Sequence, residues 1–236
     1  MTQIGTLAEK SLHAALKEWI AQPGDQFEVM VDNFVIDIVR GDLLIEIQTG
    51  NFSAMKRKLG QLLDSHPVHL LHPIPREKWI VRQTASGNQI SRRKSPKRGR
   101  VENIFDELVY IPHLISHPNL SLEVLFTQEE QILRDDGKGS WRRKRWSIHD
   151  QRLLNVAERA VFKSVADFRD LLPPTLPQPF TNADLAESLP CPTRLAQKMT
   201  YTLRESGVIT LVGKQKRALL YEVPVENGAV ACFSGL

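Results

Sequence analysis

The sequence predicts an α/β protein in which a mixed β-sheet is flanked by helices and is followed by a small α+β domain. Strands rich in β-branched residues occupy residues 27–48, and segments with helical spacing of apolar residues precede and follow them. The stretch LLPPTLPQP, residues 171–179, has the composition of a stiff connector. We therefore expect two domains, residues 1–172 and residues 173–236.

Composition narrows the class of protein. The chain has 236 residues, of which 42% are hydrophobic and 25% charged, with 31 basic and 27 acidic residues. Two cysteines, Cys191 and Cys232, show no CxxC spacing, which favours a reducing, cytoplasmic location over a disulfide framework. The first residues lack the pattern of a signal peptide, and no apolar run reaches the roughly 18 residues of a membrane span.

The elements of the first domain follow from periodicity and from breakers. Pro23-Gly24 ends a first helix, Pro67 ends a second, and Pro112 interrupts a third helical segment. We expect the remaining chain to form strands, apart from two basic loops at residues 91–100 and 137–147. The expected helices are 7–21, 52–64, 101–117 and 149–170, and the expected strands are 27–39, 43–48, 68–74, 78–82 and 120–128.

Acidic residues stand in an apolar hairpin, VIDIVRGDLLIEIQTGN, residues 35–51. A two-residue turn at Gly41-Asp42 would pair Arg40 with Leu43, Ile38 with Ile45 and Asp37 with Glu46. This register places four isoleucines, residues 36, 38, 45 and 47, on one face. On the other face the two carboxylates would oppose each other, with Cβ atoms about 4.5–5.5 Å apart.

Two opposed carboxylates among aliphatic residues repel each other and resist desolvation, which costs several kcal/mol unless a partner is present. A divalent cation removes this cost, and Mg²⁺ favours carboxylate, carbonyl and water oxygens. We therefore expect Asp37 and Glu46 to bind Mg²⁺ or Mn²⁺, although two half-exposed edge-strand charges would also explain the pattern.

At these residues the sequence resembles the PD-(D/E)xK nuclease superfamily, whose core is a helix, a hairpin with Asp and Glu-x-Lys, and a second helix. The resemblance covers residues 5–85 and implies a restriction-endonuclease-like fold, with Asp37, Glu46 and the Ile47 carbonyl as metal ligands. Ile36 replaces the motif's proline, and Gln48 replaces its lysine, although glutamine carries no positive charge.

The second helix of the resemblance offers replacement lysines. By angle along an α-helix, Lys56 lies closest to the apolar face and Lys58 second, so we expect Lys56 to serve, with Lys58 in reserve. Gln48 is the weaker candidate for orienting the attacking water. Resolvase-like members contribute a glutamate from the first helix, and Glu9 occupies a similar place.

Basic residues are concentrated in two segments, which suits neutralisation of phosphates with release of counterions. Trp141 and Trp146 bracket the second segment and could stack on unpaired bases, although such rings more often anchor a strand. A solubilising or disordered loop, or a basic targeting tag, is the alternative. The expected nucleic-acid contacts in these segments are Arg92, Arg93, Lys94, Lys97, Arg98, Arg100, Arg142, Arg143, Lys144 and Arg145.

Residues 181–222 resemble a winged helix-turn-helix, with Thr181 as the N-cap of its short first helix. The resemblance implies that helix 193–206 enters a major groove and that the hairpin tip meets phosphate. Docking of a protein partner or homodimerisation is the alternative. The groove-facing side would carry Arg194, Gln197, Lys198 and Thr202, and the tip Lys214, Lys216 and Arg217.

These features predict a metal-dependent endonuclease that hydrolyses phosphodiester bonds, in DNA more than in RNA. Neither an HExxH zinc motif, a phosphate-binding glycine loop nor a GxSxG elbow is present. Two alternatives stay open. One is a nuclease-like binding or regulatory protein that has lost turnover, and the other is a winged-helix transcription regulator with a ligand-sensing first domain.

Overall fold

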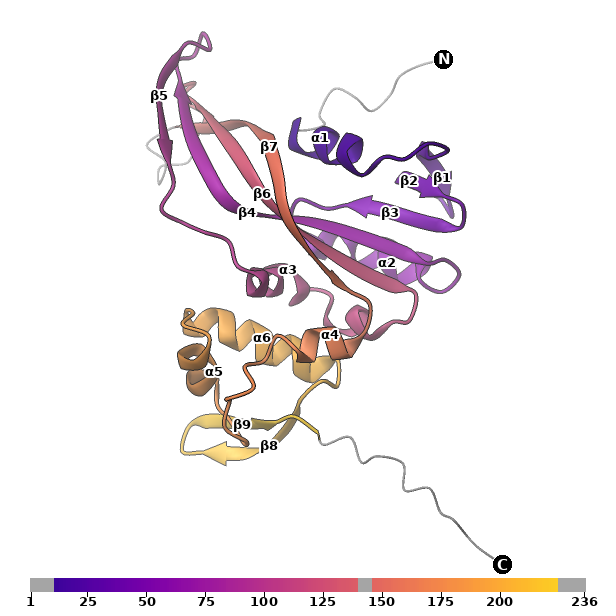
Figure 1. The fold of residues 1–236 in the computed structure, drawn as a ribbon, viewed down its shortest axis with the longest axis vertical. Helices are drawn as coiled ribbons and strands as arrows, with labels where there is room; N and C mark the ends of the chain where they lie inside the picture. Colours follow the sequence, from indigo (N-terminus) through magenta and orange to yellow (C-terminus); the bar gives the residue numbers. More distant parts are fainter. Residues whose placement is uncertain (1–10, 140–145, 225–236) are drawn as a thin grey trace, which may run out of the picture.

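The computed structural model describes residues 11–139 and 146–224 (Figure 1). Within these residues, seven strands form one mixed sheet in the order β1-β2-β3-β4-β6-β7, and β5 pairs with the outer part of β4. Two further strands form a separate hairpin. The strands are β1 (Gln26–Val31), β2 (Phe34–Arg40), β3 (Leu43–Ile47), β4 (Val68–Gln83), β5 (Gln89–Lys94), β6 (Leu120–Arg134), β7 (Ser147–Phe162), β8 (Thr210–Gln215) and β9 (Ala218–Glu222).

The α/β class and the mixed sheet agree with the prediction. β4 runs parallel to β3 and β6, whereas the other neighbouring pairs are antiparallel. Local turn chemistry accounts for the first meander. Asp32 and Asn33 both have positive φ, as a type I′ turn requires, and Gly41 has φ +57° at the β2–β3 turn.

Long strands replace several of the predicted elements. The predicted strands 68–74 and 78–82 are one strand, β4, with an irregularity in its pairing at Arg76. The first four residues of the predicted loop 91–100 belong to strand β5. The predicted helix 149–170 is wrong, because residues 147–162 form β7 and only α4 (Val165–Arg169) is helical. Pairing with β6 along the whole of β7 outweighs its local helical pattern.

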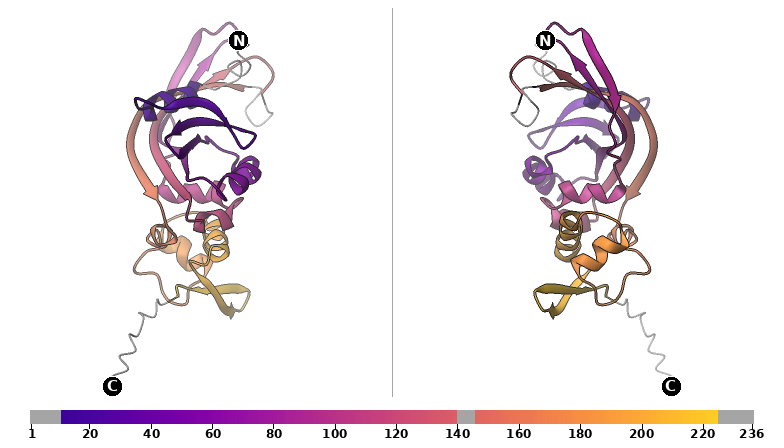
Figure 2. Two further views of the ribbon diagram at one scale, coloured as in Figure 1. Left: turned by 90° about the vertical axis from the view of Figure 1, so that its right-hand side faces the viewer. Right: turned by 90° about the vertical axis from the view of Figure 1, so that its left-hand side faces the viewer.

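Helices cover both faces of the sheet (Figures 1 and 2). α1 (Ser11–Ile20) packs Leu12 and Leu16 against Ile38, Ile45 and Ile47 of the hairpin. The opposite face is covered by short helices that continue into the larger core. They are η1 (Phe52–Met55), α2 (Lys56–Leu62), η2 (Val101–Ile104), α3 (Phe105–Leu108) and η3 (Pro112–Ser116). No helix of the described ranges is long and apolar enough to cross a membrane.

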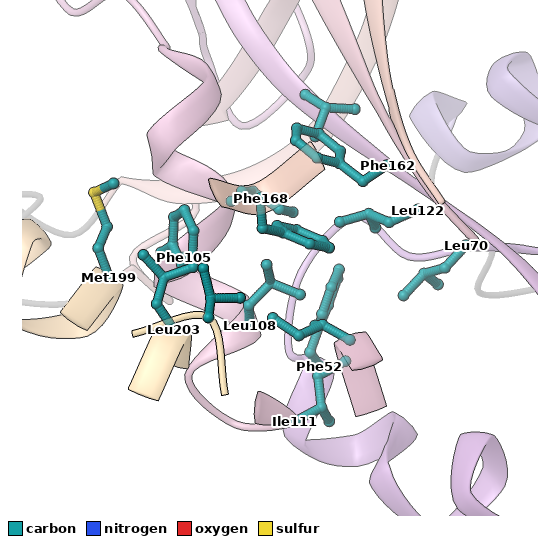
Figure 3. Packing of buried hydrophobic residues seen from close by; sticks show 14 of the residues in the cluster. Phe52, Leu70, Phe105, Leu108, Ile111, Leu122, Phe162, Phe168, Met199 and Leu203 are labelled. Atoms are coloured by element: carbon teal, nitrogen blue, oxygen red, sulfur yellow. The ribbon is translucent and has the colours of Figure 1, made fainter. Parts of the chain in front are cut away.

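The larger core continues into the C-terminal part of the chain. α5 (Asn182–Ser188) and α6 (Thr193–Glu205) lie below α3 in Figure 1, with α4 beside α6, and α6 packs on α3. Figure 3 shows aromatic residues of α3 and α4 between sheet residues and the α6 side chains of Met199 and Leu203. The rings of Phe162 and Phe168 stack with centroids 4.7 Å apart. One continuous apolar cluster therefore joins the predicted second domain to the sheet.

Of two predictions for the C-terminal helices, one is confirmed and the other is wrong. Thr181 is the N-cap of α5, as expected, because its side chain accepts hydrogen bonds from the amides of Ala183 and Asp184. Thr202 was expected on the exposed side of α6, but it is fully buried. The exposed side is instead formed by Arg194, Gln197 and Tyr201, since α6 turns its remaining surface to α3, α5 and η3.

We expect Leu203→Ala to lower the free energy of unfolding by about 2–5 kcal/mol, because the fully buried side chain joins α6 to α3. Tyr201→Ala is the matched control on the exposed side of the same helix, and it should change stability little. Urea denaturation followed by circular dichroism measures both. A loss below 1 kcal/mol for Leu203→Ala would contradict the joined core.

Candidate active site

Strands β2 and β3 separate at the acidic residues. Their ladder runs from Arg40↔Leu43 to Ile38↔Ile45, as predicted, but it ends there, so the predicted pair of Asp37 with Glu46 is not part of it. Beyond the ladder, side-chain carboxylates instead of main-chain carbonyls accept the hydrogen bonds of the backbone amides. Asp37 Oδ2 accepts the Ile47 amide at 2.9 Å, and Glu46 Oε1 lies 3.4 Å from the Asp37 amide. The two acids therefore stand at the fork between the strands.

The fork also corrects the predicted isoleucine face. Ile38, Ile45 and Ile47 pack with α1, as the register implies, but Ile36 belongs to the larger core on the opposite side. β2 no longer follows the ladder beyond Ile38, so the alternation of its side chains relative to β3 is not maintained there.

Lys58, from α2, reaches the acids. Its Nζ donates to Glu46 Oε1 at 2.6 Å and to the Val35 carbonyl at 2.6 Å. Glu46 is buried, with 4% of the residue exposed, so the ion pair is largely removed from water. Such a pair is sensitive to the loss of either partner, because the remaining charge stays buried.

The preference for Lys56 over Lys58 at this position was wrong, since Lys56 is exposed. The reason lies in the first turn of the helix. Residues 52–55 form the 3₁₀ helix η1, which turns about 120° per residue, whereas an α-helix turns about 100°. The extra rotation over this turn moves Lys58 toward the buried face and Lys56 away from it.

Asp37 is held from the other side by α1. His13 Nε2 donates to Asp37 Oδ2 at 3.2 Å, and Lys17 Nζ lies 3.6 Å from Oδ1. Lys17 also donates to Glu28 Oε1 at 3.0 Å. His13 and Lys17 were not among the site residues predicted from the sequence. Their i,i+4 spacing beside the apolar Leu12 and Leu16 places them on one side of α1 and was the available signal.

We call the side chains of His13, Lys17, Asp37, Glu46 and Lys58 the acid site. Burial raises the pKa of Glu46 above its ordinary value, and Lys58 only partly offsets this. Burial alone would also raise the pKa of Asp37. Hydrogen bonds from His13 and from the Ile47 amide, with the charges of His13 and Lys17, outweigh burial and lower that pKa. The two carboxylates thus have different proton affinities.

Gln48 does not face the acids. The side-chain amide of Gln48 donates to the carbonyls of Gly50 and Asn51. The main-chain carbonyl of Gln48 accepts a hydrogen bond from His72 Nδ1 at 2.7 Å. At the far end of the same turn, Glu107 Oε2 accepts the Phe52 amide at 2.9 Å. Gln48 therefore fixes the turn between β3 and η1, and the candidate role in orienting water has no geometric support from this position.

Side chains supply only part of the ligand set that a hard divalent cation needs at this site. No group of three or more His, Cys, Asp or Glu side chains in residues 11–139 and 146–224 is arranged to hold a metal ion. Asp37 and Glu46 supply two carboxylates at the fork, and the Ile47 carbonyl is the main-chain oxygen of the residue that follows Glu46. One or two carboxylates completed by carbonyl, water and substrate oxygens is the usual Mg²⁺ environment. Glu9, the candidate glutamate of the first predicted helix, lies outside the described residues.

Acidic neighbours neutralise several residues of the first basic segment. Arg92 pairs with Glu130 at 2.6 Å, and Lys94 pairs with Glu77. Both cations also lie over the Trp79 ring. Arg100 binds Glu102 at 3.1 Å and the Pro190 carbonyl at 3.0 Å. Arg93, Lys97 and Arg98 are exposed, so these three are better placed for phosphate contacts.

The other predicted contacts are divided as well. Arg142, Arg143, Lys144 and Arg145, with Trp141, lie outside the described residues, whereas Trp146 packs under Arg82. Lys198 Nζ donates to Asp106 Oδ1 at 2.7 Å, which turns it toward α3. Arg194 and the hairpin-tip residues Lys214, Lys216 and Arg217 are exposed.

His72, beside this site, makes stability depend on pH. Burial lowers the pKa of His72 below its ordinary value, so the folded protein keeps the ring neutral. The unfolded chain takes up a proton below about pH 6.5. The free energy of unfolding should therefore fall from pH 7 to 5.5, with a slope of at most about 1.4 kcal/mol per pH unit from this group. Urea titrations of the wild type and His72→Gln test this, and equal slopes in both proteins would refute it.

The fold and the site together define an α/β protein whose mixed sheet carries paired carboxylates and a lysine at a strand fork. Residues 10–163 match the family described as a domain of unknown function (DUF8091), and the chain belongs to this family. An "Uncharacterized protein" of Treponema pallidum (strain Nichols) is 33% identical over 230 residues, covering 95% of this chain and 90% of that protein. No solved structure matches.

Proposed function

We propose that this protein is a metal-dependent endonuclease of PD-(D/E)xK type that hydrolyses phosphodiester bonds in nucleic acid. One observation carries the proposal: β2, β3 and α2 bring Asp37, Glu46 and Lys58 together at the strand fork. Two acids on a forked hairpin with a lysine on Glu46 are the functional parts that the superfamily resemblance requires. In this interpretation Lys58 takes the place of the lysine that Gln48 replaces.

Asp37, Glu46 and the Ile47 carbonyl would hold Mg²⁺ or Mn²⁺. When bound, such an ion supplies electrophilic activation of the phosphodiester and of water. His13 and Lys17 keep Asp37 ionised and ready to ligate, since they lower its pKa. The Lys58 ammonium, anchored on Glu46 and on the Val35 carbonyl, places positive charge where the phosphate would gain negative charge.

Side-chain carboxylates and ammonium groups are equal in number in the acid site, since Asp37 and Glu46 meet Lys17 and Lys58. A divalent ion would therefore bind together with an anion, and the phosphodiester of the substrate is such an anion.

We propose DNA as the nucleic-acid substrate, because the C-terminal elements have the order of a winged helix. α5, α6 and the hairpin β8–β9 follow one another in the order of a winged helix, and the hairpin tip exposes Lys216 and Arg217. We propose that this unit docks on DNA through the tip and the Arg194 side of α6. Because α6 packs on α3, binding there would keep a fixed geometry relative to the sheet.

A cleavage panel tests the proposed activity. The purified full chain is incubated with end-labelled single-stranded, duplex and branched DNA and with RNA, in Mg²⁺, in Mn²⁺ and in EDTA. We expect products on at least one DNA substrate that require the metal ion. Binding without products on every substrate and with either metal would overturn the endonuclease.

The second candidate is a nuclease-like nucleic-acid binder without turnover. One observation favours it: in this structure lysines already neutralise both acids, as Lys58 sits on Glu46 and Lys17 beside Asp37. In that case the lysines are permanent counterions and no metal is needed. Tight binding that is indifferent to Mg²⁺, with no cleavage, would select this candidate.

A further inference from the structure

A cavity lies next to the acid site, between β4 and α3. It has a volume of about 290 Å³. Pro73, Ile74 and Pro75 of β4 form its apolar wall, and the rim includes Thr49, which follows Glu46 by three residues. The polar lining residues are His72, Lys78, Ser95, Lys97, Asn103, Asp106 and Glu107. A concave apolar site with a few convergent polar groups is the usual form of a small-ligand pocket.

The segment of residues 95–99, which we call the strap, closes the cavity on one side. Both of its ends are fixed to β4, since the Ser95 amide donates to the Lys78 carbonyl at 2.7 Å and the Gly99 amide to the Pro75 carbonyl at 2.9 Å. A Cβ on Gly99 would lie only 2.4 Å from Ile74 Cγ2, so glycine permits this close crossing. The strap is thus a fixed wall that holds Lys97 at the cavity, which we call the strap pocket.

The polar groups of the pocket include both donors and acceptors. His72 Nδ1 donates to the Gln48 carbonyl, so the neutral ring keeps Nε2 as an acceptor. Asn103 Oδ1 accepts the Arg100 amide at 2.9 Å, while its Nδ2 makes only a long contact of 3.5 Å with Asp106. Glu107 adds a carboxylate, and Lys97 adds a cation at the exposed side. Nucleobase edges present the same mixture of donors and acceptors.

The pocket and the acid site share one turn. Gln48 and His72 are hydrogen-bonded to each other, and Glu107 lines the pocket while it accepts the Phe52 amide. Thr49 lies three positions after Glu46 in the sequence, so the Cα atoms of the two residues are at most about 10 Å apart. Stacked nucleotides repeat about every 3.4 Å along a strand, so one chain of nucleotides can occupy both places within a few residues.

From this geometry we propose that the strap pocket receives an unpaired nucleobase of the strand whose phosphodiester lies at Asp37 and Glu46. The ring would pack on Pro73, Ile74 and Pro75, its edge would meet His72, Asn103 and Glu107, and Lys97 would contact its phosphate. This inference rests on the proposed function and names its substrate class, nucleic acid with an unpaired nucleotide beside the cut. A paired base inside a duplex cannot enter the pocket.

The test uses 2-aminopurine, whose fluorescence rises when the base leaves its stacked neighbours. Single-stranded DNA carrying the probe at successive positions is titrated with the full chain in EDTA, so that no cleavage can occur. We expect a several-fold emission increase at one position or two adjacent positions. An abasic residue at that position should weaken binding about tenfold, the scale of one base contact.

Two pairs of variants locate the signal. Thr49→Phe narrows the rim and should abolish the emission increase, whereas Thr49→Ser, at the same exposed position, should keep it. Lys97→Ala should reduce the increase measured at saturating protein. Lys163→Ala removes the same charge from an exposed position outside the pocket lining, and it should leave that saturated increase in place.

Uniform emission at every probe position, or equal binding of the abasic strand, would overturn the pocket assignment. So would the absence of any binding to single strands, or an emission increase that survives Thr49→Phe. The outcome is separate from that of the cleavage panel. Cleavage without a positional signal would refute the pocket alone, and a positional signal without cleavage would refute the nuclease alone.

Discussion

Replacing Asp37 by asparagine should reduce Mg²⁺-dependent cleavage on the order of 10³-fold, and Glu46→Gln should have a similar effect. Either change removes one of the two side chains that would hold the cation, and the bound ion is expected to supply several kcal/mol of transition-state stabilisation. Single-turnover rates on the substrate selected by the cleavage panel measure the loss. Both amides are nearly isosteric with the acids, but Glu46→Gln leaves Lys58 without its counterion, so melting temperatures are recorded beside the rates.

Glu28→Gln is the matched control for these two changes. Glu28 also pairs with Lys17, but it stands on β1 and does not take part in the fork. Its rate should stay within a few-fold of the wild type. Full activity of Asp37→Asn or Glu46→Gln, in protein whose circular dichroism matches the wild type, would contradict the assignment of the acid site.

Lys58→Met should lower the cleavage rate about 10²-fold, the usual loss when one preorganised charge-stabilising donor is removed. Lys56→Met, two residues earlier on the same helix and exposed, should leave the rate nearly unchanged. The rates of the two variants can be compared directly because each variant loses one lysine charge. The structure differs from the simple helical projection on this point, so the pair also tests the 3₁₀ turn of residues 52–55.

A structural counterion role for Lys58 predicts a different result. If Lys58 only neutralises the buried Glu46, Lys58→Met should destabilise the fold, and Lys58→Arg should restore stability and rate together. If Lys58 acts on the phosphate, Lys58→Arg should restore stability while the rate stays low, because guanidinium places its charge differently. Melting temperatures recorded beside the rates separate the two roles.

The hairpin could be predicted from the sequence because its signals are local. A glycine turn and alternating isoleucines define the register from Arg40↔Leu43 to Ile38↔Ile45, which the structure contains. The direction in which β2 leaves the ladder depends on α1 and α2, which are distant in sequence. For that reason Ile36 was assigned to the wrong face of the sheet. The lysine beside Glu46 was assigned incorrectly because residues 52–55 form a 3₁₀ turn instead of an α-helical turn.

Nonlocal pairing accounts for the other differences. Residues 149–162 have apolar residues at helical spacing, yet they pair with β6 along its length, which the local pattern cannot indicate. His13 and Lys17 reach Asp37 only because α1 crosses the sheet at this place. Likewise, the strap pocket is formed by four separated segments, and no single segment carries a motif for it.

Titration of the full chain with Mn²⁺ in an isothermal calorimeter is the most direct test of the central claim that Asp37 and Glu46 share a divalent cation. The account predicts a saturable heat in the wild type that is lost in Asp37→Asn and in Glu46→Gln and is kept in Glu28→Gln. No saturable heat in the wild type, or the same heat in all four proteins, would contradict it.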